Sequence, residues 1–221
     1  MSYSNWAVAL ADYFFNQKFA HKRVRLMVDA QTLNTEFKAL GGEIGFKQCI
    51  DDGPEWLDTK DQDLFEVCSY LHQIWGRKIK PIGYPELTNN APPFLPYLCL
   101  FSYVWTIEGD FHASNFTKRL ESIFPCHGMN RNQNMKWCSD HLWKGLSSWS
   151  SNNDGKLGIF KIDHLGGMAH VGISRAQAIF RPSEISLLPE IFRACGLRPE
   201  DSDDINDIHE AVKGTLSAED I

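Results

Sequence analysis

The sequence lacks an uninterrupted apolar run long enough to cross a membrane, which takes about 20 residues. Its longest uncharged stretch, residues 87–107, is interrupted by Asn89, Asn90 and three prolines. The N-terminus also lacks the basic start and the small-residue cleavage site of a secretory signal, and Asp12 falls within its apolar run. We therefore expect a cytoplasmic protein with no membrane partner.

Catalytic signature motifs are lacking as well. The sequence contains no G-x-S-x-G, Walker A, H-E-x-x-H or G-x-G-x-x-G pattern. Two triplets, Asp58-Thr59-Lys60 and Asp154-Gly155-Lys156, match the D-x-K pattern of metal-dependent nucleases, and residues 108–112 gather two carboxylates and an imidazole. Both kinds of cluster are common in ordinary polar turns. We predict a non-enzymatic protein and keep a small metal-dependent nuclease as an alternative.

Closely spaced cysteine pairs are absent, because the six cysteines are 12 or more residues apart. This spacing favours buried, reduced thiols over a disulfide framework. One group, Cys126, His127, Cys138 and His141, contains metal-binding residue types. The adjacent Cys126 and His127 cannot easily point both side chains at one ion, so we predict no zinc site and no cofactor.

Positive charge is scarce, since 22 Lys and Arg stand against 28 Asp and Glu for a net charge of -6. Residues 199–221 hold eight acidic residues against Lys213, a net charge of -7. Residues 1–108 hold 10 basic and 13 acidic residues, and residues 109–198 hold 11 and 7, giving -3 and +4. The stretch 109–198 is therefore the candidate for an anionic partner, although +4 is weak for a dedicated nucleic-acid domain.

Helical periodicity of apolar residues is what the sequence has in abundance. It predicts helices over residues 4–17, 30–40, 61–76, 93–107, 113–124, 135–150, 174–180, 183–195 and 204–215. The helix over 93–107 is apolar nearly all round, so we expect it at the centre of the core with Leu98, Phe101 and Trp105 buried. In the first helix, the predicted core stripe is Trp6, Ala9, Leu10, Tyr13 and Phe14.

Short strands are predicted over residues 24–28, 158–163 and 169–173, and the last two could pair as a hairpin. The predicted fold class is mostly α (α+β), a compact helical domain with a few short strands. We expect one domain over residues 1–198, with candidate subdomains 1–108 and 109–198. An acidic tail, residues 199–221, follows it.

Residues 172–195 have the layout of a helix-turn-helix, with a short helix, a Pro-Ser turn and a second helix. The candidate DNA-binding side chains are Arg175, Gln177, Arg181 and Arg193. Pro189 would kink the second helix, and Glu184 and Glu190 would repel phosphates. A structural helix pair is therefore favoured, and a DNA-binding regulator stays an alternative.

Eight segments between residues 6 and 198 form a pattern through their order, their spacing and their residue types. They are Trp6–Leu10, Tyr13–Phe15, Val24–Asp29, Pro92–Leu98, Gly109–Phe116, Trp143–Trp149, Gly155–Gly158 and His170–Pro182. Together they resemble uncharacterised bacterial proteins of anti-phage defence islands. The resemblance implies a helical scaffold or adaptor working beside an ATPase, helicase or nuclease encoded elsewhere, and it transfers no catalytic residue.

The sequence as a whole favours a non-enzymatic accessory or scaffold subunit of such a defence complex. Its partners would be other protein subunits, with DNA as a further candidate. The loop over residues 78–91, the acidic tail and the lack of catalytic motifs support docking.

Overall fold

The structure is a computed structural model. It describes residues 2–26, 28–57, 64–80, 82, 84, 87, 90–107, 119–120, 122 and 133–160, with the backbone alone for Phe65 and residues 133–140. These residues belong to the first of two units of the chain, residues 1–179. The elements predicted after residue 163, and most of the helix predicted over 113–124, lie outside the described residues.

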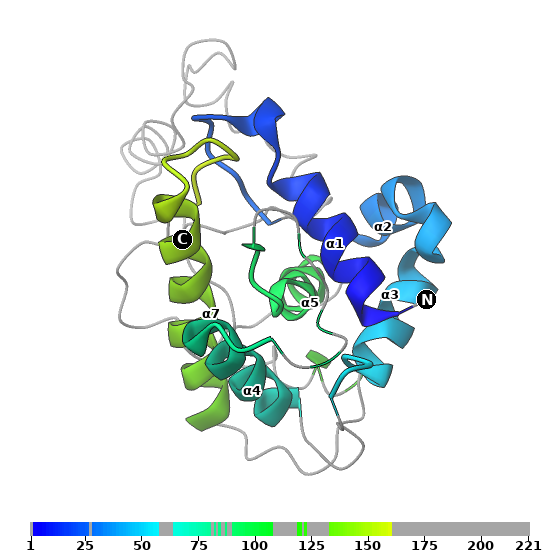
Figure 1. Ribbon diagram of the computed structural model, residues 1–221. Helices are drawn as coiled ribbons and strands as arrows, with labels where there is room; N and C mark the ends of the chain where they lie inside the picture. The colour runs from blue at the N-terminus through cyan, green and yellow to red at the C-terminus, as the bar shows by residue number, and fades with distance from the viewer. Residues whose placement is uncertain are drawn as a thin grey trace, which may run out of the picture. The chain divides into compact units, whose positions relative to one another are not determined.

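The described residues are mostly helical, which confirms the predicted fold class. The helices are α1 (Tyr3–Phe14), α2 (Ala30–Glu36), α3 (Gly42–Asp52), α4 (Leu64–Arg77), α5 (Leu95–Thr106) and α7 (Gln133–Asn152), with 3-10 turns η1 (Gln17–Phe19) and η2 (Lys38–Leu40) (Figure 1). Strand pairing among the described residues is limited to one isolated parallel bridge between Arg23 and Ile159.

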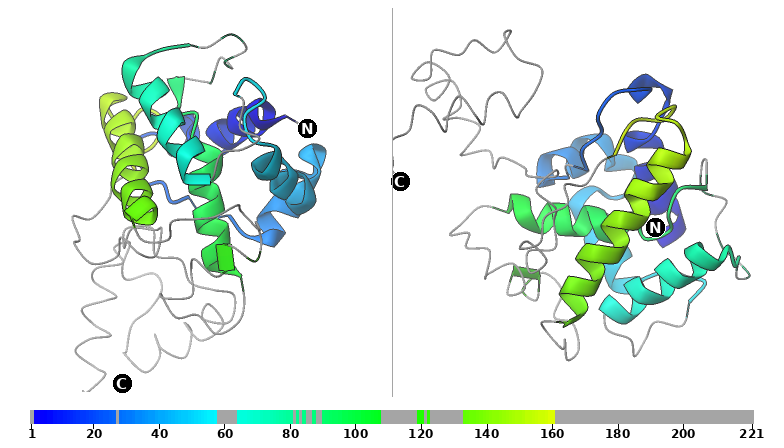
Figure 2. Two further views of the ribbon diagram at one scale, coloured as in Figure 1. Left: turned by 90° about the horizontal axis from the view of Figure 1, so that it is seen from below. Right: turned by 90° about the vertical axis from the view of Figure 1, so that its left-hand side faces the viewer.

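Helix α5 is the central helix, as its composition predicts. It contacts α1 and α3, while α4 packs against α7 (Figure 2). All its residues from Leu95 to Val104 are buried, but Trp105 is only partly buried, so this side chain lies at the margin of the core and not within it. The helix begins at Leu95 and not at Pro93, and Pro96 is tolerated because the first turn needs no N–H from it.

The buried face of α1 differs from the predicted stripe. Its buried residues are Tyr3, Trp6, Ala7, Leu10, Ala11 and Phe14. Tyr13 is 38% exposed, and its ring lies 5.1 Å from that of Phe37, at the end of α2. Ala7 and Ala11, and not the predicted Ala9 and Tyr13, therefore lie on the core face of α1.

In the strand predicted over residues 24–28, the described residues 24–26 and 28 form no β-ladder. The segment does alternate as a strand would, since Val24, Leu26 and Val28 are all buried. The hydroxyl of Ser102 in α5 donates to the Leu26 carbonyl, and that of Thr106 shares its proton between the Tyr103 carbonyl at 2.7 Å and the Val28 carbonyl at 3.2 Å. Helix hydroxyls therefore satisfy buried carbonyls that a neighbouring strand would otherwise satisfy. In the strand predicted over 158–163, the described part contributes the bridge at Ile159.

The helix predicted over residues 30–40 is interrupted at Phe37, between α2 and η2. Its N-terminus is capped as predicted, because the Thr32 N–H donates to Asp29 Oδ1 at 2.6 Å. Gly41, with φ of 92°, ends η2, and α3 follows at once. The sequence did not predict α3, since glycines 42 and 45 weaken its helix propensity.

The thiols that the structure describes fit the prediction of buried, reduced cysteines. Cys49 and Cys99 are buried and form no disulfide, and Cys68 is buried as well. Burial raises the pKa of the Cys49 and Cys99 thiols, which makes both unreactive. Over the described part of the chain, every helix is too short or too polar to cross a membrane.

Candidate functional site

The end of α4 and the loop after it expose apolar and basic side chains together. Ile79 is 50% exposed and Ile82 is 99% exposed. Arg77, Lys78 and Lys80 are also exposed. We call Arg77, Lys78, Ile79, Lys80, Ile82 and Tyr84 the basic–apolar loop, and all of them except Arg77 fall in the loop predicted over 78–91.

The first end of this loop is fixed by the way α4 stops. The Ile79 N–H donates to the Ile74 carbonyl at 3.0 Å, and the Lys78 N–H donates to the Trp75 carbonyl at 3.1 Å. These two bonds form a Schellman motif, which needs a left-handed residue at the position of Lys78. Lys78 has φ of 54°, a conformation that glycine adopts more readily. Lys78 is therefore an exposed cation at a position where glycine would give the more stable backbone conformation.

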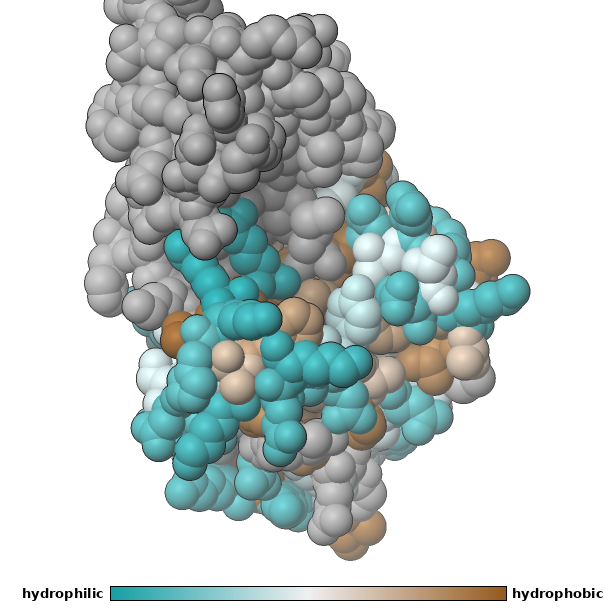
Figure 3. Space-filling model, turned by 90° about the horizontal axis from the view of Figure 1, so that it is seen from above, coloured by the Kyte–Doolittle hydropathy of each residue, from teal (hydrophilic) through white to brown (hydrophobic). Residues whose placement is uncertain are grey.

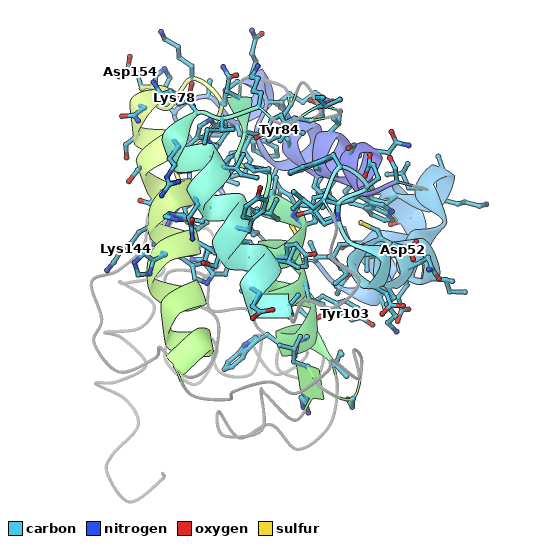
Figure 4. The ribbon with its side chains drawn as sticks, turned by 60° about the horizontal axis from the view of Figure 1, so that its bottom comes forward. Asp52, Lys78, Tyr84, Tyr103, Lys144 and Asp154 are labelled. Atoms are coloured by element: carbon cyan, nitrogen blue, oxygen red, sulfur yellow. The ribbon has the colours of Figure 1, made fainter. Side chains whose placement is uncertain are left out.

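The other end of the loop is fixed by Tyr84. Its ring lies 5.1 Å from that of Trp56, and burial raises the pKa of the Tyr84 hydroxyl to about 12. Figure 4 shows Lys78 and Tyr84 near the end of α4. Ile82, which is 99% exposed, therefore lies in sequence between two residues whose contacts are described, Lys78 and Tyr84.

Helices α4 and α7 pack against each other through aromatic rings. The His72 ring lies 5.7 Å from that of His141 and 6.0 Å from that of Phe94. A Cβ on Gly145 would come within 3.1 Å of Phe94 and 3.3 Å of Trp75, so this glycine allows the close approach of the two helices. Because His72 meets His141 and Trp75 meets Gly145, the helices run side by side in the same direction.

The His72–His141 pair was not foreseen from the sequence, which grouped His141 with cysteines nearer in the chain. Burial lowers the pKa of His72, and the neighbouring His141 lowers it further. Both effects keep the His72 imidazole neutral near pH 7. Within the described residues, no three His, Cys, Asp or Glu side chains are placed to hold a metal ion. The side chains of Cys126, His127 and Cys138 lie outside the described residues.

A second polar cluster joins α3 to α5. Glu43 accepts hydrogen bonds from the Tyr103 hydroxyl at 2.5 Å and from Lys47 Nζ at 2.7 Å. These hydrogen bonds lower the pKa of the Glu43 carboxyl. Because Oε1 of the carboxylate accepts from donors on both helices, the cluster ties α3 to α5.

The other predicted site residues divide into two groups. Asp154 and Lys156 lie in an exposed turn after α7, with Oδ2 and Nζ 4.0 Å apart. The triplet 58–60 and the cluster 108–112 lie outside the described residues. So do Arg175, Gln177, Arg181 and Arg193, and the helix-turn-helix stays a prediction.

Comparisons of this chain with protein-family models, with curated proteins and with solved structures each found no match.

Proposed function

We propose that this chain is a non-enzymatic accessory or scaffold subunit that docks on a partner protein through its basic–apolar loop. The observation that supports this function best is the exposure of Ile82, at 99%, beside Ile79 in a loop anchored at both ends.

Energetics favour such a role for the loop. Burying an isoleucine side chain on a partner stabilises a complex by about 1.5–3 kcal/mol. An anchored loop loses little conformational freedom on binding, so more of that free energy appears as affinity. The neighbouring Lys78 and Lys80 favour a partner whose apolar pocket has an acidic rim.

The sequence resemblance suggests the class of partner, an ATPase, helicase or nuclease of a bacterial anti-phage system. Such a subunit would act in the cytoplasm, where these enzymes meet phage nucleic acid. A DNA-binding regulator that uses residues 172–195 remains the second candidate from the sequence.

A pair of matched variants tests the docking role. Ile82→Asp changes the loop, and Ile44→Asp changes an 82% exposed isoleucine on α3, on a different element. Tagged full-length chains would be purified from the native host, and co-purifying proteins would be quantified by mass spectrometry. We expect Ile82→Asp to lose a partner that both the wild type and Ile44→Asp retain.

The partner so identified would then be purified and titrated calorimetrically against all three chains. A loss of affinity of about tenfold or more for Ile82→Asp alone would support the proposal, as expected for a central contact. Equal affinities for all three chains would refute it.

A further inference from the structure

A segment near the N-terminus lies against the loop that follows α7. The His21 N–H donates to the Gly155 carbonyl at 2.8 Å. The Val24 N–H donates to the Ile159 carbonyl at 2.9 Å, and the Ile159 N–H donates to the Lys22 carbonyl at 2.8 Å. In Figure 1 the blue segment after α1 and the yellow-green loop after α7 meet at the top. These bonds bring together basic residues that are more than 130 positions apart in sequence.

We call Lys18, Lys22, Arg23, Arg25 and Lys156 the basic edge. Arg25 is partly buried and the other four are exposed. Residues 13–28 contain no Asp or Glu, although the whole chain has a net charge of -6. Asp154 is the carboxylate in the same turn as Lys156, 4.0 Å from it. Among the described residues, these five cations stand against Asp154 and the flanking Asp12 and Asp29, so the surface carries a net positive charge. Figure 3 shows the described surface from above the view of Figure 1, with hydrophilic and hydrophobic side chains side by side.

The positive charges are concentrated and poorly neutralised. Val24 and Leu26 point into the core, so Arg23 and Arg25 project together from the opposite side of the extended segment. Burial lowers the pKa of Arg25, and the charge of Arg23 lowers it further. Lys47–Glu43 and Lys156–Asp154 are ion pairs between described residues, and neither involves the cations of residues 18–25. An anionic ligand would relieve this repulsion.

An aromatic side chain lies within the same segment. Phe19, next to Lys18, is 37% exposed. Guanidinium groups match the geometry of phosphate, and an exposed ring offers a surface for a nucleobase. We propose that the basic edge binds the phosphate backbone of a nucleic acid, with Phe19 placed to stack on an unpaired base. None of the basic-edge residues belongs to the basic–apolar loop or to residues 172–195.

Fluorescence anisotropy of the full-length chain with a labelled 20-nucleotide single strand and a 20-base-pair duplex tests the proposal. Lys22→Gln/Arg23→Gln removes two cations of the edge, and Lys38→Gln/Lys144→Gln removes two exposed cations elsewhere. We expect the edge variant to bind about tenfold more weakly at 50 mM salt, with a salt slope smaller by about 2. The control variant should bind as the wild type does. Phe19→Ala should weaken binding of the single strand more than that of the duplex.

A melting temperature for each variant shows whether it is folded. If Lys22→Gln/Arg23→Gln is unfolded, Lys18→Gln/Lys156→Gln decides in its place, because it removes two other charges of the same edge. Absence of nucleic-acid binding by the wild type at 50 mM salt would overturn the proposal. Equal losses in the edge and control variants would also overturn it, as would tight binding of polyglutamate without binding of either nucleic acid.

Discussion

Two glycines show how single residues support the surfaces described above. Gly158, in the loop after α7, has φ of 115°, and a Cβ there would lie 2.3 Å from Val24 Cγ2. Gly76, near the end of α4, lies within the helix, and a Cβ added there would meet no atom within 4 Å. The first glycine is needed for the contact between the loop and the extended segment, and the second is not needed for packing.

The two alanine substitutions should therefore have opposite effects on stability. Gly158→Ala should lower the free energy of unfolding by more than about 1 kcal/mol, because the backbone conformation and the space both oppose it. Gly76→Ala should raise it by about 0.5–1 kcal/mol, because alanine loses less backbone entropy in a helix. Urea denaturation of both variants measures these changes. A neutral Gly158→Ala would contradict the close contact with Val24.

At the scale of elements, α5 organises the core. It contacts α1 and α3, and Phe94, just before its start, packs on Trp75 of α4 and lies close to Gly145 of α7. Replacing a side chain of α5 by alanine should therefore cost more folding free energy the more deeply that side chain is buried.

Leu98→Ala and Phe101→Ala each remove a fully buried side chain, so each should cost about 3–5 kcal/mol of folding free energy. Trp105→Ala should cost less, since this side chain is partly exposed. The free energies of unfolding from urea titrations would test the order. If Trp105→Ala cost more folding free energy than Leu98→Ala and Phe101→Ala, the position of Trp105 at the margin of the core would be contradicted.

Local sequence patterns predicted the elements whose form depends on their own residues. The helices α1, α4, α5 and α7 and the Asp29 cap are of this kind, although the buried face of α1 includes Ala7 and Ala11 and not Ala9 and Tyr13. The pattern failed at the segment 24–28, because the groups that satisfy its carbonyls come from Ser102 and Thr106. Likewise the basic edge and the His72–His141 pair combine residues from distant segments, and no local pattern relates them. The sequence predicted a loop at the position of the basic–apolar loop. It did not predict the hydrogen bonds at Lys78 and Ile79 or the contact of Tyr84 with Trp56.

At the scale of the whole molecule, the packing of α4 on α7 makes stability depend on pH. His72 has a lowered pKa in the folded state, so the unfolded chain binds more protons between this value and the ordinary value of about 6.5. Stability should therefore fall as pH decreases through about 6.5 and level off below the folded pKa.

Melting temperatures at pH 7.5 and pH 5.5 test this effect. The wild type should melt at a lower temperature at pH 5.5, and His72→Phe should lose part of that difference because the titrating group is gone. His21→Asn serves as a control, since His21 is exposed and asparagine tolerates its φ of 61°. The lowered pKa of Glu43 acts at more acidic pH, because its contribution is lost only as pH falls through the folded value below about 4.5. An unchanged pH dependence in His72→Phe would refute the assignment.

The two hydroxyls on α5 also set the register of the extended segment, residues 24–28, against the helix. Ser102 and Thr106 are four residues apart, a rise of about 6.0 Å along a helix. The carbonyls of Leu26 and Val28 are two residues apart, about 6.6 Å along an extended chain. This near match fixes the register of the segment against the helix. A slip of one residue would turn Arg23 and Arg25 toward the core and Val24 and Leu26 toward water. An insertion of one residue between positions 23 and 28 should therefore be tolerated far less than one between positions 80 and 84.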